Sequence, residues 1–209
     1  MRNLKRTLSL VMAMALIVGM MVVSASAAGK DFGDQAEIMA RVNPLNPNSQ
    51  TEIDDAIANG ADVIMLPMWR TADDLRQLVH MVNGRAKVMP LLETDTAADN
   101  LPEAVKVSGI DQMHIGLNDL HLCYHQKFMF QLLTDGTVDR LCAELREASI
   151  PYGFGGVGRP GSGTLPAEYI IGEHYRLGSQ YVILSFARKV LFPALSVSPT
   201  IRPRSATLF

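Results

Sequence analysis

The chain has 209 residues, with 19 basic and 21 acidic side chains, a formal net charge of −2 and a hydrophobic content of 48%. This length is typical of one globular domain. The near-neutral charge and the scattered Lys and Arg residues form no basic patch, so we expect no nucleic-acid partner. Cys123 and Cys142 are the only cysteines, too few for a disulfide framework, and are expected to be reduced thiols.

Residues 1–28 differ from the rest of the chain. Arg2, Lys5 and Arg6 make a basic start, residues 8–23 are apolar and uncharged, and residues 25–27 read Ala-Ser-Ala. This layout predicts a secretory signal peptide. The apolar run is short for a spanning helix, which needs about 20 residues, but an uncleaved membrane anchor stays open as an alternative. The segment thus predicts export or anchoring, with membrane contact only if it is uncleaved.

After an expected linker at residues 29–38, short apolar runs alternate with helical patterns. The runs predict six strands at residues 38–42, 62–66, 87–92, 112–117, 152–154 and 180–185. The helical patterns predict five helices at residues 50–59, 72–82, 97–107, 138–148 and 166–175, the fourth being the clearest part of a longer helical stretch. Ser49 with Glu52 is expected to form a capping box, and Thr71 to cap the second helix.

Repeated strand–helix units predict an α/β fold with a parallel sheet. The pattern alone does not separate a (β/α)8 barrel of the TIM type from an open, doubly wound sheet. A complete barrel has eight strands and about 250 residues, so the barrel alternative would be incomplete here, lacking two βα units. We assign residues 39–185 to this domain and residues 186–209, with their three prolines, to an irregular tail.

Polar residues stand where the expected strands end, which is where parallel α/β folds place their functional groups. Glu93 ends the third strand and Asp119 the fourth. Two carboxylates with water and substrate oxygens commonly hold Mg²⁺ or Mn²⁺, although helix capping or solvated rim charges explain the same residues. Arg41, at the end of the first strand, is suited to bind a carboxylate in a bidentate manner or to form an internal salt bridge.

Two other motifs could bind ligands. A glycine-rich stretch at residues 153–163 follows a late strand, and its backbone N–H groups, at Gly155 and Gly156 for example, could bind an anion or form a tight turn. His121 and His125 share a helix face, but no further ligand motif accompanies them, so we expect no zinc site.

Four strand-end motifs, in order, resemble those of the HpcH/HpaI aldolase and citrate-lyase β-subunit superfamily over residues 40–185. They are ARVNP at 40–44, GADVIMLP at 60–67, LLET at 91–94 and HIGLNDL at 114–120. The resemblance implies a barrel enzyme dependent on Mg²⁺ or Mn²⁺ that cleaves or forms a C–C bond in a 2-oxo acid or acyl-CoA substrate through an enolate. It also implies a cytoplasmic location, which is the alternative to export. Because members of the superfamily often self-associate, a homo-oligomer is a further expectation.

By this resemblance Glu93 and Asp119 ligate the metal, and Arg41 binds the substrate and stabilises the enolate. Pro67, Gly155 and Gly156 are further candidate substrate-binding residues at the same rim. Two other functions compete with this one. The chain could be a non-catalytic or degraded barrel fragment, exported or anchored, or a different barrel enzyme that binds a phosphorylated substrate at the glycine-rich stretch.

Overall fold

The structure, a computed structural model, describes residues 36–158 and 165–184. In these residues one parallel sheet runs in the order β1-β2-β3-β4-β5-β6. The strands are β1 (Met39–Arg41), β2 (Val63–Leu66), β3 (Lys87–Leu92), β4 (Met113–Ile115), β5 (Tyr152–Val157) and β6 (Tyr181–Leu184). Each strand therefore pairs with the next one along the chain, which is the order that a barrel requires and a doubly wound sheet does not have.

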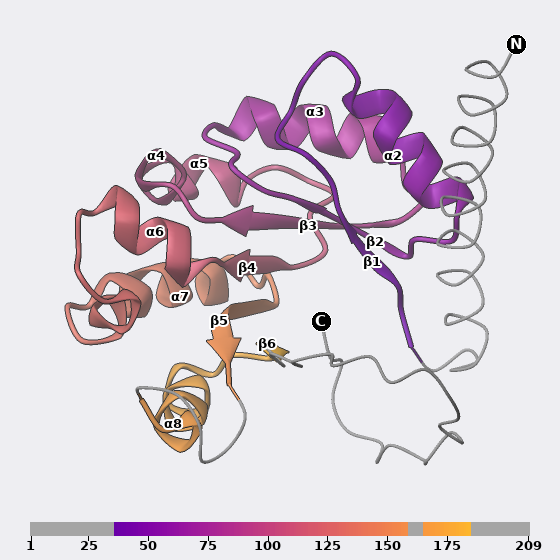
Figure 1. Ribbon diagram of the computed structural model, residues 1–209. Coiled ribbons are helices and arrows are strands. Elements are labelled where there is room, and N and C mark those ends of the chain that lie inside the picture. The colour runs from indigo at the N-terminus through magenta and orange to yellow at the C-terminus, as the bar shows by residue number, and fades with distance from the viewer. Residues whose placement is uncertain (1–35, 159–164, 185–209) are drawn as a thin grey trace, which may run out of the picture.

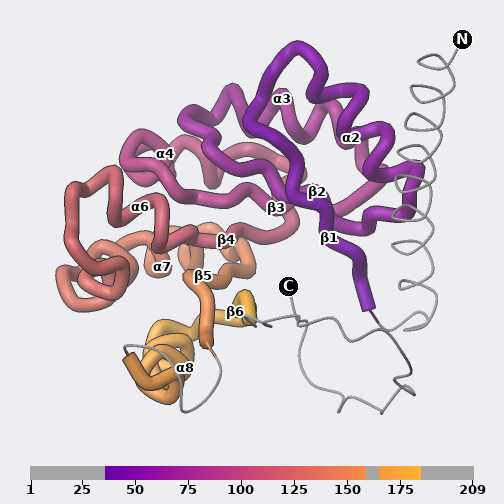
Figure 2. The backbone as a smooth tube through the Cα atoms, in the orientation of Figure 1, coloured from indigo at the N-terminus to yellow at the C-terminus, as the bar shows by residue number. Residues whose placement is uncertain are grey.

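The sheet curls, and the helices lie along its outer side (Figure 1). They are α2 (Ser49–Ala58), α3 (Ala72–Val82), α4 (Asp95–Asp99), α5 (Leu101–Ala104), α6 (Leu117–Cys123), the 3-10 helix η2 (Met129–Leu133), α7 (Thr137–Glu147) and α8 (Ala167–Leu177). The tube in Figure 2 runs around the curve from β1 at one edge to β6 at the other. The six-stranded, curled sheet confirms the prediction of an incomplete (β/α) barrel.

The two faces of the sheet belong to two apolar clusters. Along β2, Ile64 and Leu66 pack with the helices in the larger cluster, whereas Val63 and Met65 join a smaller cluster with Met89 and Leu91. Alternate residues of a strand point to opposite faces, so the small cluster marks the concave side of the sheet. This explains why the strand sequences are apolar throughout rather than alternating.

Several local predictions are confirmed. The helix at 72–82 and the strand at 87–92 have the expected bounds as α3 and β3. Thr71 forms a capping box with Asp74, since the Asp74 backbone N–H donates to Thr71 Oγ1 at 3.3 Å and the Thr71 N–H donates to Asp74 Oδ2 at 2.9 Å.

Other local predictions are wrong. Asn48, not Ser49, is the N-cap of α2, and it makes no side-chain capping bond. Glu52 instead accepts hydrogen bonds from the backbone and side-chain N–H groups of Asn43, at 3.0 and 2.8 Å. Because this contact ties the chain after β1 to α2, the Glu52 carboxylate is not available for the expected capping box.

The single helix expected at 97–107 is also wrong, because the chain forms two short helices, α4 and α5, that meet at Asn100. Pro102 stands at the start of α5, where its missing N–H costs nothing but prevents one continuous helix.

Residues 1–35, 159–164 and 185–209 are not described, so the expected signal segment, most of the linker and the tail lie outside the described residues. No helix in the described ranges has the length and apolar character needed to cross a membrane.

Candidate active site

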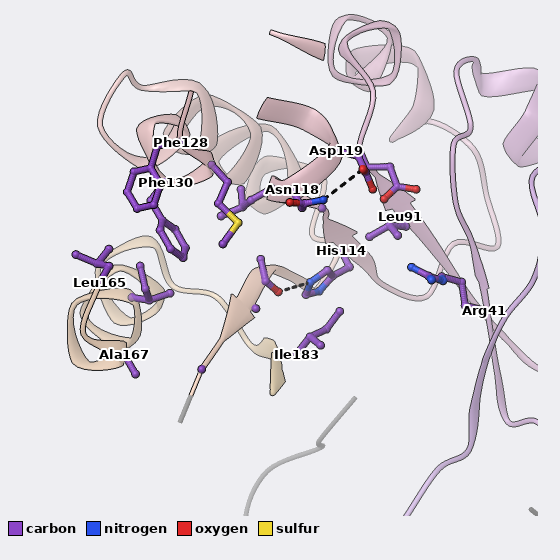
Figure 3. A pocket seen from close by; sticks show the side chains of 18 residues that line it. Arg41, Leu91, His114, Asn118, Asp119, Phe128, Phe130, Leu165, Ala167 and Ile183 are labelled. Carbon is purple, nitrogen blue, oxygen red and sulfur yellow. Dashed lines mark hydrogen bonds between the residues drawn. The ribbon is translucent and has the colours of Figure 1, made fainter. Parts of the chain in front are cut away.

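A cavity of about 550 Å³ lies at the carboxyl ends of the central strands (Figure 3). This volume is within the range of small-molecule sites. Its wall takes residues from every strand except β2, from α6, η2 and α8, and from the segments that connect them. Charged and polar groups come from Arg41, Glu93, His114, Asn118 and Asp119.

Glu93 follows β3 directly and is almost fully buried, with 4% of its surface exposed. Its Oε1 accepts a hydrogen bond from the Met68 backbone N–H at 3.1 Å. Burial first, and then the negative charge of Asp119, raise the pKa of the Glu93 carboxyl to about 7. Met68 and the positive charge of Arg41 oppose this shift without cancelling it. Two carboxyl groups thus share a confined space, an arrangement that a bound cation would relieve.

Asp119 reaches this place differently from the way the sequence predicted. The strand expected at 112–117 ends at Ile115, and Asp119 lies in the first turn of α6 rather than in a loop. The strand stops because Gly116 N-caps α6 and its carbonyl accepts the Leu120 N–H at 3.2 Å. Asp119 nevertheless lines the same cavity as Glu93, close enough for a side-chain hydrogen bond to contribute to the raised pKa of Glu93.

Arg41 ends β1 and lines the cavity. Its side chain lies toward the group formed by Leu91 and Asp119 in Figure 3. The described residues show no salt bridge of Arg41, so its guanidinium keeps donors for a ligand. This placement fits the predicted role in carboxylate binding better than the alternative of an internal ion pair.

Pro67 is buried at the end of β2 but is not part of the cavity wall. The expectation that it contacts a substrate is therefore not supported. The next residue, Met68, has a positive φ of 55° and donates its backbone N–H to Glu93. The backbone after Pro67 thus acts on the site through Glu93.

Gly155 and Gly156 do line the cavity, but they belong to strand β5 and not to a loop. The strand predicted at 152–154 continues to Val157, so the expectation that the glycine-rich stretch forms a loop or turn is wrong for residues 155–157, and residues 159–164 lie outside the described part. Gly155 has φ +54°, and a β-carbon there would lie 2.8 Å from Leu117 Cδ1. The glycine therefore permits a left-handed backbone and a close approach of β5 to α6.

His114, to which the sequence pattern assigns no role, forms part of the cavity wall. It is 1% exposed, and its Nε2 hydrogen-bonds the Gly155 carbonyl at 2.9 Å. Burial lowers the pKa of His114 to about 4, so the ring is neutral at physiological pH. The signal in the sequence that could have identified His114 as a site residue is its position at the start of the motif at 114–120, two residues before Gly116.

The apolar part of the cavity was also missed. Phe128 and Phe130 meet edge to face with ring centroids 5.2 Å apart, and both line the cavity with Leu165, Ala167 and Ile170. These residues come from segments without strand-end motifs, so reading strand ends alone does not find them.

Histidine and cysteine add little metal-binding capacity. His121 Nδ1 is 3.2 Å from the Leu117 carbonyl oxygen, and within the described ranges no three His, Cys, Asp or Glu side chains gather in a group that would hold a metal. A cation at Glu93 and Asp119 would thus complete its coordination with water or ligand oxygens, which is the usual situation for Mg²⁺.

A curled parallel sheet with outer helices and a carboxylate-containing cavity at its carboxyl edge defines a (β/α)-barrel type of protein. The HpcH/HpaI aldolase/citrate lyase family matches residues 20–127. The chain belongs to this family. No curated protein sequence matches the chain.

Solved structures share the fold at low sequence identity. An HpcH/HpaI aldolase from Desulfitobacterium hafniense DCB-2 superposes with a TM-score of 0.61 at 14% identity, covering 77% of this chain and 69% of that one. A citrate lyase from Burkholderia xenovorans LB400 superposes with a TM-score of 0.60 at 11% identity, covering 79% of this chain and 60% of that one. The citrate lyase beta subunit from M. tuberculosis was solved in complex with oxaloacetate and magnesium. It superposes with a TM-score of 0.53 at 14% identity, covering 70% of this chain and 66% of that one. The chain thus spans 60–69% of these three relatives.

Proposed function

We propose that this protein is a lyase dependent on Mg²⁺ or Mn²⁺ that breaks or forms a C–C bond next to the carbonyl group of a 2-oxo acid. Membership of an aldolase and lyase family supports the class of reaction. The observation that carries the proposal for this chain is the juxtaposition of Glu93, buried at 4% exposure, with Asp119 in one cavity.

The residues present fit a divalent cation. Both side chains offer hard oxygen ligands, and repulsion between them disfavours the ionised pair in the absence of a positive charge. One structural relative was solved with oxaloacetate and magnesium, which supports the same ion here. When bound, such an ion acts as a Lewis acid that stabilises negative charge on a carbonyl oxygen.

The reaction we propose is an aldol cleavage. In a 4-hydroxy-2-oxo acid, the hydroxyl proton leaves to a base, C4 becomes an aldehyde carbonyl, and the C3–C4 bond breaks. Its electron pair forms the enolate of the 2-oxo acid, and a proton added at C3 completes pyruvate or a homologue. Synthesis is the reverse. Arg41 would bind and orient the substrate carboxylate by two N–H donors, and its charge would favour the enolate oxygen.

His114 contributes in another way. Because its Nε2 is paired with the Gly155 carbonyl and its low pKa keeps it neutral, it forms a fixed, uncharged wall beside the reacting group. Acyl-CoA esters are a further substrate class within this proposal, since a thioester carbonyl forms the same kind of enolate.

Enolate formation can be tested without knowledge of the natural substrate. Pyruvate in D₂O should exchange its C3 protons when the protein and Mg²⁺ or Mn²⁺ are present, as followed by ¹H NMR. Glu93→Gln and Asp119→Asn should abolish the exchange. Asp99→Asn is the matched control, because Asp99 is exposed in α4 and does not line the cavity.

The alternative of a non-catalytic barrel fragment rests on the six strands of the described sheet, two fewer than a full barrel has. A folded protein that binds the ion but exchanges no C3 protons would support that alternative and overturn the lyase proposal. Exchange that persists equally in Glu93→Gln and Asp119→Asn would assign the chemistry to other residues.

A further inference from the structure

The cavity has two chemically distinct ends. Figure 3 shows Arg41 and Asp119 on one side and Phe128, Phe130 and Leu165 on the other, with His114 and Ile183 between them. The carboxylate end is the one on which the proposed reaction depends. The opposite end is a wall of aromatic and aliphatic side chains.

The charges of the cavity wall fall at one end. Among the described residues that line it, Arg41 is the single Arg or Lys side chain, and Glu93 and Asp119 are the acidic ones. Asn118, next to them, donates its Nδ2 to Asp119 Oδ1 at 3.4 Å. In the described part, the apolar end therefore presents no cation to pair with a second negative charge on a ligand.

The cavity is also larger than the reacting group needs. Small-molecule sites of 300–1,000 Å³ hold ligands well beyond the size of pyruvate, and this one measures about 550 Å³. The group of the substrate that extends beyond the oxo acid would lie against Phe128 and Phe130. Phe128 is 40% exposed, so apolar surface at this edge is available for a ligand to cover.

We infer that the substrate carries an uncharged, apolar group on the side remote from its 2-oxo acid. The inference rests on the proposed function and narrows it to 4-hydroxy-2-oxo acids whose aldehyde product is aliphatic or aromatic. A dicarboxylic oxo acid, such as the oxaloacetate bound by one structural relative, is disfavoured because its second carboxylate would lose water and none of the described side chains at the apolar end would pair with it.

Two probes of matched shape test this selectivity. 2-Oxoglutarate and 5-methyl-2-oxohexanoate share the oxo-acid group and differ at the far end, where a carboxylate replaces an isopropyl group. Pyruvate serves as the reference without a far end. Binding to the full chain is measured by isothermal titration calorimetry with saturating Mg²⁺. We expect 5-methyl-2-oxohexanoate to bind about tenfold more tightly than pyruvate, as burial of three or four apolar carbons allows, and 2-oxoglutarate no more tightly than pyruvate.

A charge placed on the apolar wall should reverse the order. Phe128→Arg puts a cation where the far end would lie, so 2-oxoglutarate should become the tighter ligand. Leu122→Arg is the matched control, because Leu122 is 56% exposed on α6 and does not line the cavity. It should leave the order of the three probes unchanged.

The outcomes separate the two proposals. Tighter binding of 2-oxoglutarate than of 5-methyl-2-oxohexanoate by the unmodified protein, or equal binding of all three probes, overturns the inference while the metal-dependent oxo-acid site stands. Failure of all three probes to bind a folded protein in the presence of Mg²⁺ overturns the proposed function itself.

Discussion

Gly116 leaves the space in which the Glu93 side chain lies. A β-carbon on Gly116 would be 2.9 Å from Glu93 Cβ and 3.0 Å from Glu93 Oε2. The backbone of Gly116 has an ordinary φ of −85°, so close approach, and not a left-handed conformation, is what requires glycine here. The residue that caps α6 therefore also fixes the position of a candidate metal ligand that follows the neighbouring strand β3.

Gly116→Ala should displace Glu93 and weaken Mn²⁺ binding by about tenfold or more, the range seen when groups that orient metal ligands are altered. Isothermal titration calorimetry measures the affinity, and circular dichroism checks the fold. Gly172→Ala is the control, since nothing lies within 4 Å of a β-carbon there. Being in helix α8, it should leave Mn²⁺ affinity unchanged and stabilise the protein by up to about 1 kcal/mol. Unchanged affinity in Gly116→Ala would contradict this reading of the site.

The raised pKa of Glu93 makes the metal-free protein less stable as pH rises. The folded protein holds the proton up to a pH of about 7, whereas the usual value is 4.5, so between these values the folded state binds more protons than the unfolded state. The free energy of unfolding should then fall through this window, by about 3 kcal/mol in all. Glu93→Gln should remove this loss, as measured by urea unfolding in the presence of EDTA.

The comparison of the wild type with Glu93→Gln isolates the effect of one carboxyl group. If the difference in unfolding free energy between wild type and Glu93→Gln stays constant from pH 4.5 to 7, the carboxyl is not perturbed as described. Added Mn²⁺ should stabilise the wild type most above pH 7, where the carboxylate is ionised in the folded protein and needs no deprotonation to bind.

Two buried histidines have the opposite effect at lower pH. Burial lowers the pKa of His114 and of His174 from 6.5 to about 4, and their mutual repulsion adds to the shift of His174. The unfolded state therefore takes up protons first as pH falls, and the folded state should lose stability between pH 6.5 and 4. His174→Leu, in a Glu93→Gln background, should reduce this loss by on the order of 2–3 kcal/mol.

His80→Leu controls for the removal of a histidine, because His80 is exposed on α3. His174 stacks on Phe154 with ring centroids 3.8 Å apart, so the Leu variant has its own baseline stability. The slope of stability against pH is the quantity to compare. Equal slopes in His174→Leu and His80→Leu would show that His174 does not titrate as expected.

The capping box at α3 should contribute measurably to stability. Thr71→Ala removes the hydroxyl that accepts the Asp74 N–H and should cost about 1 kcal/mol in the free energy of unfolding. Thr51→Ala, at an exposed position inside α2, should instead stabilise slightly, because Ala favours helix more than Thr does. The two substitutions are chemically identical, so the same sign for both would argue against the cap.

The sequence was most informative where local chemistry decides the structure. The cap at Thr71 and the continuous apolar run of β3 do not depend on distant contacts, and both were predicted at the right residues, although the part of Asp74 in the cap was not. The capping box expected between Ser49 and Glu52 does not form, because the Asn43 side chain after β1 binds the Glu52 carboxylate instead. Such competition depends on how the elements pack and leaves no trace in local spacing.

The candidate site shows the same division. Arg41, Glu93 and Asp119 follow strand runs, and parallel strands bring their carboxyl ends to one edge, so their convergence was predictable. Phe128, Phe130 and Leu165 lie between the strands, in or next to η2 and before α8, where tertiary packing sets the path of the chain. Pro67 ends a strand as the others do, but its side chain is outside the cavity wall, because a strand end fixes a position on the rim and not the direction of the side chain.

Binding of one Mn²⁺ ion is the most direct test of the central claim that Glu93 and Asp119 share a cation. The decrease in the electron paramagnetic resonance signal of free Mn²⁺ measures this binding, with the full chain titrated at pH 8. We predict one ion per chain in the wild type and in Asp99→Asn, and its loss in both Glu93→Gln and Asp119→Asn. Undiminished stoichiometric binding in both of those variants, or no binding to folded wild-type protein, would contradict the account.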